Sequence, residues 1–119
     1  MKRESSTVDE LLAAARARLD RVDAAPAQSA MADGALLVDI RSDSQRAQDG
    51  VVPGATFIPR NVLEWRVEEM SAAPRVIVMC NQGYQSSLAA ATLRDLGLEA
   101  TDLIGGFQAW LAAGLPVER

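Results

Sequence analysis

Apolar residues recur with a helical period near the start of the chain. From residue 8 they fall at i, i+3, i+4, i+7, i+11 and i+14, a series made of Val8, Leu11, Leu12, Ala15, Leu19 and Val22. Thr7 and Glu10 are three residues apart, which is the spacing of a capping box. The pattern predicts one helix over residues 7–23. Its charged positions are expected to face solvent, namely Arg16, Arg18, Asp20, Arg21 and Asp23.

Beyond residue 34, short apolar runs alternate with segments that have helical features. The runs cover 36–40, 55–58, 75–79 and 100–104, and each predicts a β-strand. Helices are expected from Ser42-Asp43 to Asp49, from Asn61 onward, over 86–96 and over 107–113. Strands that alternate with helices predict an α/β fold with a central, mainly parallel β-sheet flanked by helices on both faces.

The length of 119 residues fits one compact domain. Residues 24–34 are rich in Ala, Pro, Gln, Ser and Gly, so we expect a loop there. Residues 1–34 then form an N-terminal helix and a connecting loop, and residues 35–119 form the main body. The sequence has no apolar run of membrane-spanning length and no pattern of a targeting signal, so we expect a cytoplasmic protein.

The residue counts exclude several kinds of chemistry. The chain has one cysteine, Cys80, and no histidine. An intramolecular disulfide, a Cys/His zinc site and catalysis with an imidazole base are therefore excluded. The net charge of −4 argues against nucleic acid or an anionic membrane as a partner, because both need a basic surface. We expect neither a metal nor a cofactor.

Cys80 is the main candidate for a reactive group. It follows the most strongly β-branched run, Val76-Ile77-Val78, and so lies at the carboxyl end of a strand, where open α/β sheets bind ligands. Gly83 allows a tight turn after it, and Ser86 or Ser87 is expected to cap the next helix. Backbone N–H groups in such a turn favour a thiolate. An inert, buried free cysteine is the alternative interpretation.

Four segments, spaced along residues 35–117, resemble the rhodanese-like domain family. They are Asp39-Ile40-Arg41, Gly50-Val51-Val52-Pro53-Gly54-Ala55, the loop Cys80-x-x-Gly83-x-x-Ser86, and Gly105-Gly106-Phe107-Gln108-Ala109-Trp110 followed by Gly114-Leu115-Pro116-Val117. Each segment is weak evidence by itself, and the four together in this order are specific. The resemblance makes residues 35–119 a rhodanese-like domain.

The resemblance implies a sulfurtransferase, in which Cys80 is the catalytic nucleophile and carries a persulfide. The persulfide would be held by the backbone of the loop formed by Asn81, Gln82, Gly83, Tyr84, Gln85 and Ser86, with Ser86 also capping the helix. A thiolate is enough for this chemistry, so the absence of histidine fits it. Asp39 and Arg41 match family positions and are expected to be structural, and Phe107 and Trp110 are expected to pack in the core.

The loop departs from the family pattern because it carries no charge from Cys80 to Gln85. Active members often have Arg or Lys at the position of Gln85. We therefore expect weak activity with thiosulfate and better activity with a small-molecule or protein persulfide donor and a thiol acceptor. Arg46, Arg60 and Arg66 are candidates for contact with the substrate, and each is equally well explained as a solvated surface charge.

Two alternatives remain beside sulfur transfer. A non-catalytic rhodanese module, used for partner binding or redox sensing, would also keep a cysteine in an uncharged loop. Phosphatase or arsenate-reductase chemistry is disfavoured, because it needs an arginine six residues after the cysteine to bind the oxyanion, and that residue is Ser86.

Overall fold

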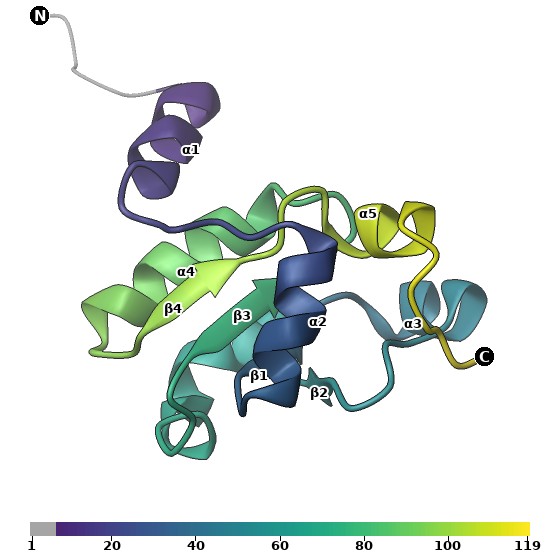
Figure 1. Cartoon of the computed structure of the whole chain (residues 1–119). Helices are drawn as coiled ribbons and strands as arrows, with labels where there is room; N and C mark the ends of the chain where they lie inside the picture. The colour runs from purple at the N-terminus through teal and green to yellow at the C-terminus, as the bar shows by residue number, and fades with distance from the viewer. Residues whose placement is uncertain (1–6) are drawn as a thin grey trace, which may run out of the picture.

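The computed structural model describes residues 7–119 and has one parallel β-sheet covered by helices on both faces (Figure 1). The elements in chain order are α1 (Val8–Arg16), α2 (Ala24–Ala32), β1 (Leu36–Asp39), α3 (Asp43–Asp49), β2 (Thr56–Phe57), the 3₁₀ helix η1 (Arg60–Glu69), β3 (Val76–Met79), α4 (Gln85–Asp95), β4 (Ala100–Asp102) and α5 (Gly106–Ala112). The strand order is β2-β1-β3-β4, and all neighbouring strands are parallel. The predicted α/β class is confirmed.

Alternating strand residues divide the core into two layers. Val38, Val76 and Val78 pack with residues of η1 and α4 on one face of the sheet. Leu37 and Ile77 pack on the other face with α2 and α5. Because both faces are covered, the central strands are buried at nearly every position, which explains why they appear in the sequence as uninterrupted apolar runs.

The first helix is shorter than predicted. Its capping box of Thr7 and Glu10 is present, but α1 ends at Arg16 rather than near residue 23. The chain then runs along the edge of β4, where the Val22 N–H donates to the Asp102 carbonyl and the Val22 carbonyl accepts from Ile104. Hydrogen bonds to the edge of β4 thus take the place of further helical hydrogen bonds. The local apolar pattern cannot predict this pairing, because it depends on a distant strand.

The predicted loop over 24–34 is wrong, since residues 24–32 form α2. Most of this segment is Ala, Gln and Met, which are good helix formers. Pro26 is the third residue of α2, in the first turn, where its missing N–H costs no helical hydrogen bond. Ala24 and Ala27 are buried against the sheet, so a small apolar face stabilises the helix.

The segment after β2 also differs from the prediction. The expected capped helix at Asn61 is instead a 3₁₀ helix that begins at Arg60, directly after Pro59, without a side-chain cap. Leu63 and Met70, seven residues apart, are nevertheless both fully buried. The Ser42 cap of α3 is confirmed, because its hydroxyl accepts from the Gln45 N–H. Among residues 7–119 no helix is long and apolar enough to cross a membrane.

Candidate functional site

Cys80 lies directly after β3, at the carboxyl edge of the sheet, as predicted. Its side chain is largely buried, and its sulfur accepts two backbone hydrogen bonds. The Gly83 N–H donates to Sγ at 3.1 Å and the Ser86 N–H at 3.4 Å. Both donors stabilise negative charge on the sulfur, because a hydrogen bond to a charged acceptor is stronger than one to a neutral acceptor.

The tight turn at Gly83 depends on glycine. Its φ is +86°, and a Cβ there would lie 2.7 Å from the Gly105 nitrogen. Gly106 is equally restricted, since a Cβ would lie 2.4 Å from the Cys80 carbonyl oxygen. This close approach lets Phe107 N–H donate to the Cys80 carbonyl at 2.8 Å. Gly105 and Gly106, at the N-terminus of α5, therefore lie against the start of the loop.

The start of α4 differs from the sequence expectation. Neither Ser86 nor Ser87 caps the helix, because the N-cap residue is Tyr84 and it makes no side-chain cap hydrogen bond. Both hydroxyls instead donate to Asp102 Oδ2, at 2.7 Å from Ser86 and 2.8 Å from Ser87. Asp102 is fully buried at the end of β4. The serines thus join the helix to the neighbouring strand.

The N-terminal segment also reaches the loop. Arg16 Nη2 donates to the Gly83 carbonyl at 2.7 Å, and Arg21 Nη2 donates to the same oxygen at 3.1 Å. Arg21 pairs with Asp102 as well, at 2.9 Å from Nε to Oδ1. The expectation that Arg16 and Arg21 face solvent is therefore wrong. The sequence reasoning missed both arginines and Asp102, because Arg16 and Arg21 are 62 or more residues away in the chain from Gly83 and Asp102.

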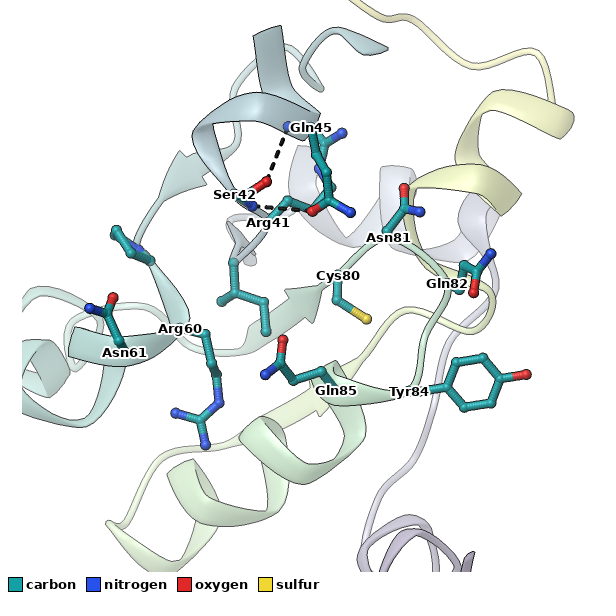
Figure 2. Close-up of a pocket in the computed structure, with 12 residues that line it drawn as sticks. Arg41, Ser42, Gln45, Arg60, Asn61, Cys80, Asn81, Gln82, Tyr84 and Gln85 are labelled. Atoms are coloured by element: carbon teal, nitrogen blue, oxygen red, sulfur yellow. Dashed lines mark hydrogen bonds between the residues drawn. The ribbon is translucent and has the colours of Figure 1, made fainter. Parts of the chain in front are cut away.

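An open cleft of about 540 Å³ lies over Cys80. Figure 2 shows the sulfur pointing toward the loop that carries Gln82, Tyr84 and Gln85. Five carboxamide side chains are part of its lining, so most of the polar groups there are uncharged. The complete lining is Ile40, Arg41, Ser42, Gln45, Pro59, Arg60, Asn61, Cys80, Asn81, Gln82, Tyr84 and Gln85.

Of the three arginines expected to contact substrate, the structure brings only Arg60 to the cleft. Its Nη1 pairs with Glu64 at 2.8 Å, so its charge is compensated. Arg46 lies over the Phe57 ring, with its Nε 3.4 Å from Asp39. Arg66 is outside the cleft lining and forms a bidentate pair with Glu69. That hydrogen bond raises the pKa of Arg66 and lowers the pKa of Glu69.

Asp39 and Arg41 form a buried pair beside the cleft. Arg41 Nη2 donates to Asp39 at 2.8 Å and to the Gly50 carbonyl at 2.8 Å. Its guanidinium carbon lies 3.8 Å from the centre of the Phe107 ring, while Nη1 has no hydrogen-bond partner among residues 7–119. The pair thereby connects the end of β1, the turn at Gly50 and α5.

Trp110 and Phe107 are buried on the α2 side of the sheet, as predicted. Trp110 Nε1 donates to the Pro116 carbonyl at 2.8 Å, which fixes the chain after α5.

Within residues 7–119 no cluster of three or more Cys, Asp or Glu side chains is placed to hold a metal ion. At this edge of the sheet the Cys80 sulfur accepts hydrogen bonds from two backbone N–H groups.

The comparisons with known proteins find a rhodanese-like family model and relatives named sulfurtransferase. The family model described as "Rhodanese-like domain" matches residues 23–113. A "Sulfurtransferase" from Allochromatium vinosum is 36% identical over 83 residues, which cover 69% of this chain and 77% of that protein. "Thiosulfate sulfurtransferase GlpE" from Vibrio cholerae serotype O1 matches with the same identity and coverage.

Two solved structures are similar over most of the chain. One is a protein of unknown function and possible tyrosine phosphatase from Rhodopseudomonas palustris CGA009, with a TM-score of 0.86 and 27% identity. The match covers 99% of this chain and 98% of that one. The other is a rhodanese-related protein from Thermoplasma volcanium, with a TM-score of 0.74 and 26% identity, covering 82% of this chain and 96% of that one.

Proposed function

The chain belongs to the rhodanese-like domain family, and from this premise we propose that it is a sulfurtransferase that carries sulfane sulfur on Cys80. The observation that carries the proposal is the pair of N–H groups, from Gly83 and Ser86, directed at the Cys80 sulfur at the floor of an open cleft. The relatives named sulfurtransferase support the same reaction class.

The reaction needs only thiolate chemistry. The Cys80 thiolate attacks the outer sulfur of a donor persulfide, the S–S bond of the donor breaks, and the donor leaves as a thiolate. Cys80 then carries the outer sulfur as a persulfide anion. An acceptor thiolate attacks that sulfur, a new S–S bond forms on the acceptor, and Cys80 leaves as a thiolate. The oxidation level is conserved overall, so no redox partner is required.

The loop geometry fits both charged states of this cycle. In the resting enzyme, the N–H groups of Gly83 and Ser86 stabilise the Cys80 thiolate. After the first transfer the negative charge lies on the outer sulfur of the persulfide, one bond beyond Cys80 Sγ. The remaining backbone N–H groups of residues 81–86 form the surface that would stabilise this charge. Positioned dipoles of this kind need little rearrangement during the reaction.

The cleft favours an organic persulfide over thiosulfate as the donor. A volume of about 540 Å³ is within the usual range for small-molecule sites and is ample for a donor with an organic body. The five carboxamides offer donors and acceptors for amide or carboxylate groups. The cations that residues 7–119 contribute to the lining are Arg60, which Glu64 already neutralises, and the buried Arg41, which pairs with Asp39, so a dianion would find little compensating charge. A low-molecular-weight or protein persulfide is therefore the proposed donor, and the free thiol implies a reducing compartment such as the cytoplasm.

Intact mass spectrometry tests the proposal. The reduced protein is mixed in parallel with glutathione persulfide, thiosulfate and mercaptopyruvate, and the expected result is a gain of one sulfur atom with the persulfide. Cys80→Ser is the control and gains none. Return of the mass to its starting value after addition of a thiol shows that the sulfur is transferable.

A non-catalytic module is the alternative that this test addresses. The uncharged loop favours it, and no gain of sulfur from any donor would establish it over the enzyme. Phosphatase activity is not proposed, although one structural relative is named as a possible tyrosine phosphatase. The residue six positions after Cys80 is Ser86, whose hydroxyl donates to Asp102, so no arginine is available there to grip an oxyanion.

A further inference from the structure

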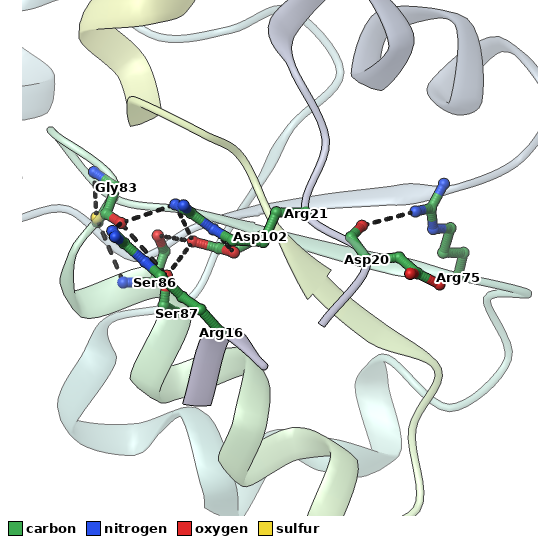
Figure 3. A network of polar contacts seen from close by, with 9 residues as sticks. Arg16, Asp20, Arg21, Arg75, Gly83, Ser86, Ser87 and Asp102 are labelled. Atoms are coloured by element: carbon green, nitrogen blue, oxygen red, sulfur yellow. Dashed lines mark hydrogen bonds and ion pairs between the residues drawn. The ribbon is translucent and has the colours of Figure 1, made fainter. Parts of the chain in front are cut away.

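Gly83 and Ser86, whose N–H groups donate to the Cys80 sulfur, are each hydrogen-bonded to one member of the Arg21–Asp102 ion pair. Arg21 Nη2 donates to the carbonyl of Gly83, and Asp102 Oδ2 accepts from the hydroxyl of Ser86. Arg21 and Asp102 are themselves joined by two hydrogen bonds, of 2.9 and 3.2 Å. Figure 3 shows this network, in which the guanidinium groups of Arg16 and Arg21 lie beside Gly83 and Asp102.

The Arg21–Asp102 pair is largely buried. The Asp102 side chain is 0% exposed and the Arg21 side chain 17% exposed. Asp102 accepts from Arg21, Ser86 and Ser87, so each of its oxygens has a partner. A buried carboxylate needs all of these partners, and a change in one of them shifts the others. The position of Gly83 relative to Ser86 is therefore coupled to the Arg21–Asp102 pair.

Arg16 adds a second guanidinium at the same point. It donates to the Gly83 carbonyl and to the Ser87 hydroxyl, and it lies 5.5 Å from the centre of the Tyr84 ring. Arg16, Arg21 and Asp102 together carry a net charge of +1, whereas the loop from Cys80 to Gln85 has no charged side chain. That charge lies at the carbonyl of the residue whose N–H donates to Sγ, and it favours an anionic Cys80 sulfur.

Both arginines precede residue 23, where the match to the family model begins. The N-terminal segment is anchored at two further places, by α1 against α4 and by Arg75 Nη2, which donates to the Asp20 carbonyl at 3.3 Å. The segment is thus docked along its length and brings its two arginines to one carbonyl oxygen of the loop.

We infer that Arg16 and Arg21, through Asp102 and the Gly83 carbonyl, are positioning residues for Cys80. They set the spacing of the two N–H donors and supply the positive charge that the loop lacks, which makes the N-terminal segment part of the reactive site. The expected effect of these residues on sulfur transfer rests on the proposed function. Their expected effect on the reactivity of the Cys80 thiolate is independent of that function.

Three variants test the inference. Arg16→Gln removes one donor to Gly83 and leaves the Arg21–Asp102 pair in place. Arg21→Lys keeps the charge beside Asp102 but cannot bind Asp102 and Gly83 together. Arg18→Gln is the matched control, because Arg18 lies in the same segment and makes only an exposed pair with Asp95. Arg21→Gln is avoided as the main variant, since it would leave Asp102 buried without its cation.

The first readout is independent of sulfur transfer. Cys80 is the only cysteine, so alkylation by iodoacetamide and the ultraviolet absorbance of the thiolate report on it alone. At a fixed pH near neutrality we expect Arg16→Gln and Arg21→Lys each to slow alkylation by about tenfold and to lower the thiolate absorbance, which corresponds to the loss of one hydrogen bond to a charged group. Arg18→Gln is expected to match the wild type. Thermal melting of Arg21→Lys is expected to stay close to the wild type.

The second readout is sulfur loading from glutathione persulfide. We expect kcat to fall about tenfold in both variants while KM stays unchanged, because the cleft lining is intact. Unchanged alkylation and thiolate absorbance in both variants, with normal folding, would overturn the inference, as would equal losses in Arg18→Gln. If the wild type takes up no sulfur while alkylation slows as expected, the proposed function fails and the positioning role stands.

Discussion

At the residue scale, the site depends on a few atoms around one sulfur. The sequence places a cysteine and a glycine three residues apart, and the fold turns that spacing into an N–H to sulfur distance of 3.1 Å. What surrounds the sulfur is mostly backbone and carboxamide. Single substitutions that add charge or volume at this point are therefore informative.

The absence of charge in the loop leads to a prediction on donor choice. Gln85 lines the cleft, and Gln85→Arg places a cation beside the donor. We expect kcat/KM with thiosulfate to rise by more than kcat/KM with glutathione persulfide, because a dianion gains more from an added positive charge. Steady-state kinetics with both donors measure the two changes. A wild type that already prefers thiosulfate, or an equal gain with both donors, contradicts the prediction.

Gly106 provides a second prediction at this scale. In Gly106→Ala the new Cβ would lie 2.4 Å from the Cys80 carbonyl oxygen, at a φ of +60° that alanine rarely adopts. We expect α5 and the loop to separate, with slower alkylation of Cys80 and a lower melting temperature. Gly114→Ala is the matched control, since it has a similar φ of +73° and no atom within 4 Å of the added Cβ. Equal effects of the two variants on alkylation would show that backbone strain alone is responsible.

At the element scale, each helix around the site is held by a specific contact of its own. The N–H groups of α5 bind the start of the loop, α4 is joined to β4 through Asp102, and α1 brings Arg16. The short length of these helices makes their caps and tertiary contacts more important than their intrinsic propensity.

Trp110 is expected to anchor α5. It is 2% exposed, packs with Leu37 and Phe107, and donates to the Pro116 carbonyl. Trp110→Ala should lower the free energy of unfolding by about 3 kcal/mol or more, because it opens a large cavity. Trp110→Phe keeps most of the apolar volume and should cost less. Urea denaturation measures both; loss of sulfur transfer without loss of stability would instead assign Trp110 to the site.

The capping box of α1 makes this helix sensitive to acid. Hydrogen bonds from the backbone and the side chain of Thr7 lower the pKa of Glu10 below 4.5. A carboxylate whose pKa is lower in the folded state stabilises that state above its unfolded pKa, and the contribution is lost as the pH falls through the lower, folded value. NMR shifts of residues 8–16 should therefore move toward coil values as the pH falls through this lowered pKa of Glu10. In Glu10→Gln this transition should disappear; its persistence would assign it to another carboxylate.

At the scale of the whole molecule, the sheet, its class and the place of Cys80 were predictable from the sequence. Apolar runs of four or five residues, such as Val76 to Met79, occur where a strand is covered on both faces, and the position of Cys80 directly after one of them follows from chain order. The sequence pattern predicts too long a helix in the N-terminal segment, and it predicts a loop where α2 forms. The reason for the second error is that α2 is stabilised by the burial of small alanines rather than by a large apolar stripe.

The sequence by itself determined an α/β chain with one thiol, no imidazole and an uncharged loop after its central strand. These properties depend on residues that are adjacent or periodic, so local physics is enough to infer them. Only the tertiary structure decided which arginines reach the site. Arg46 and Arg66 lie outside the cleft, whereas Arg16 and Arg21 bind the Gly83 carbonyl across 62 or more residues of chain. The partner of a charged side chain depends on which distant segments the fold brings together, and a periodic pattern in the sequence carries no information about such long-range contacts.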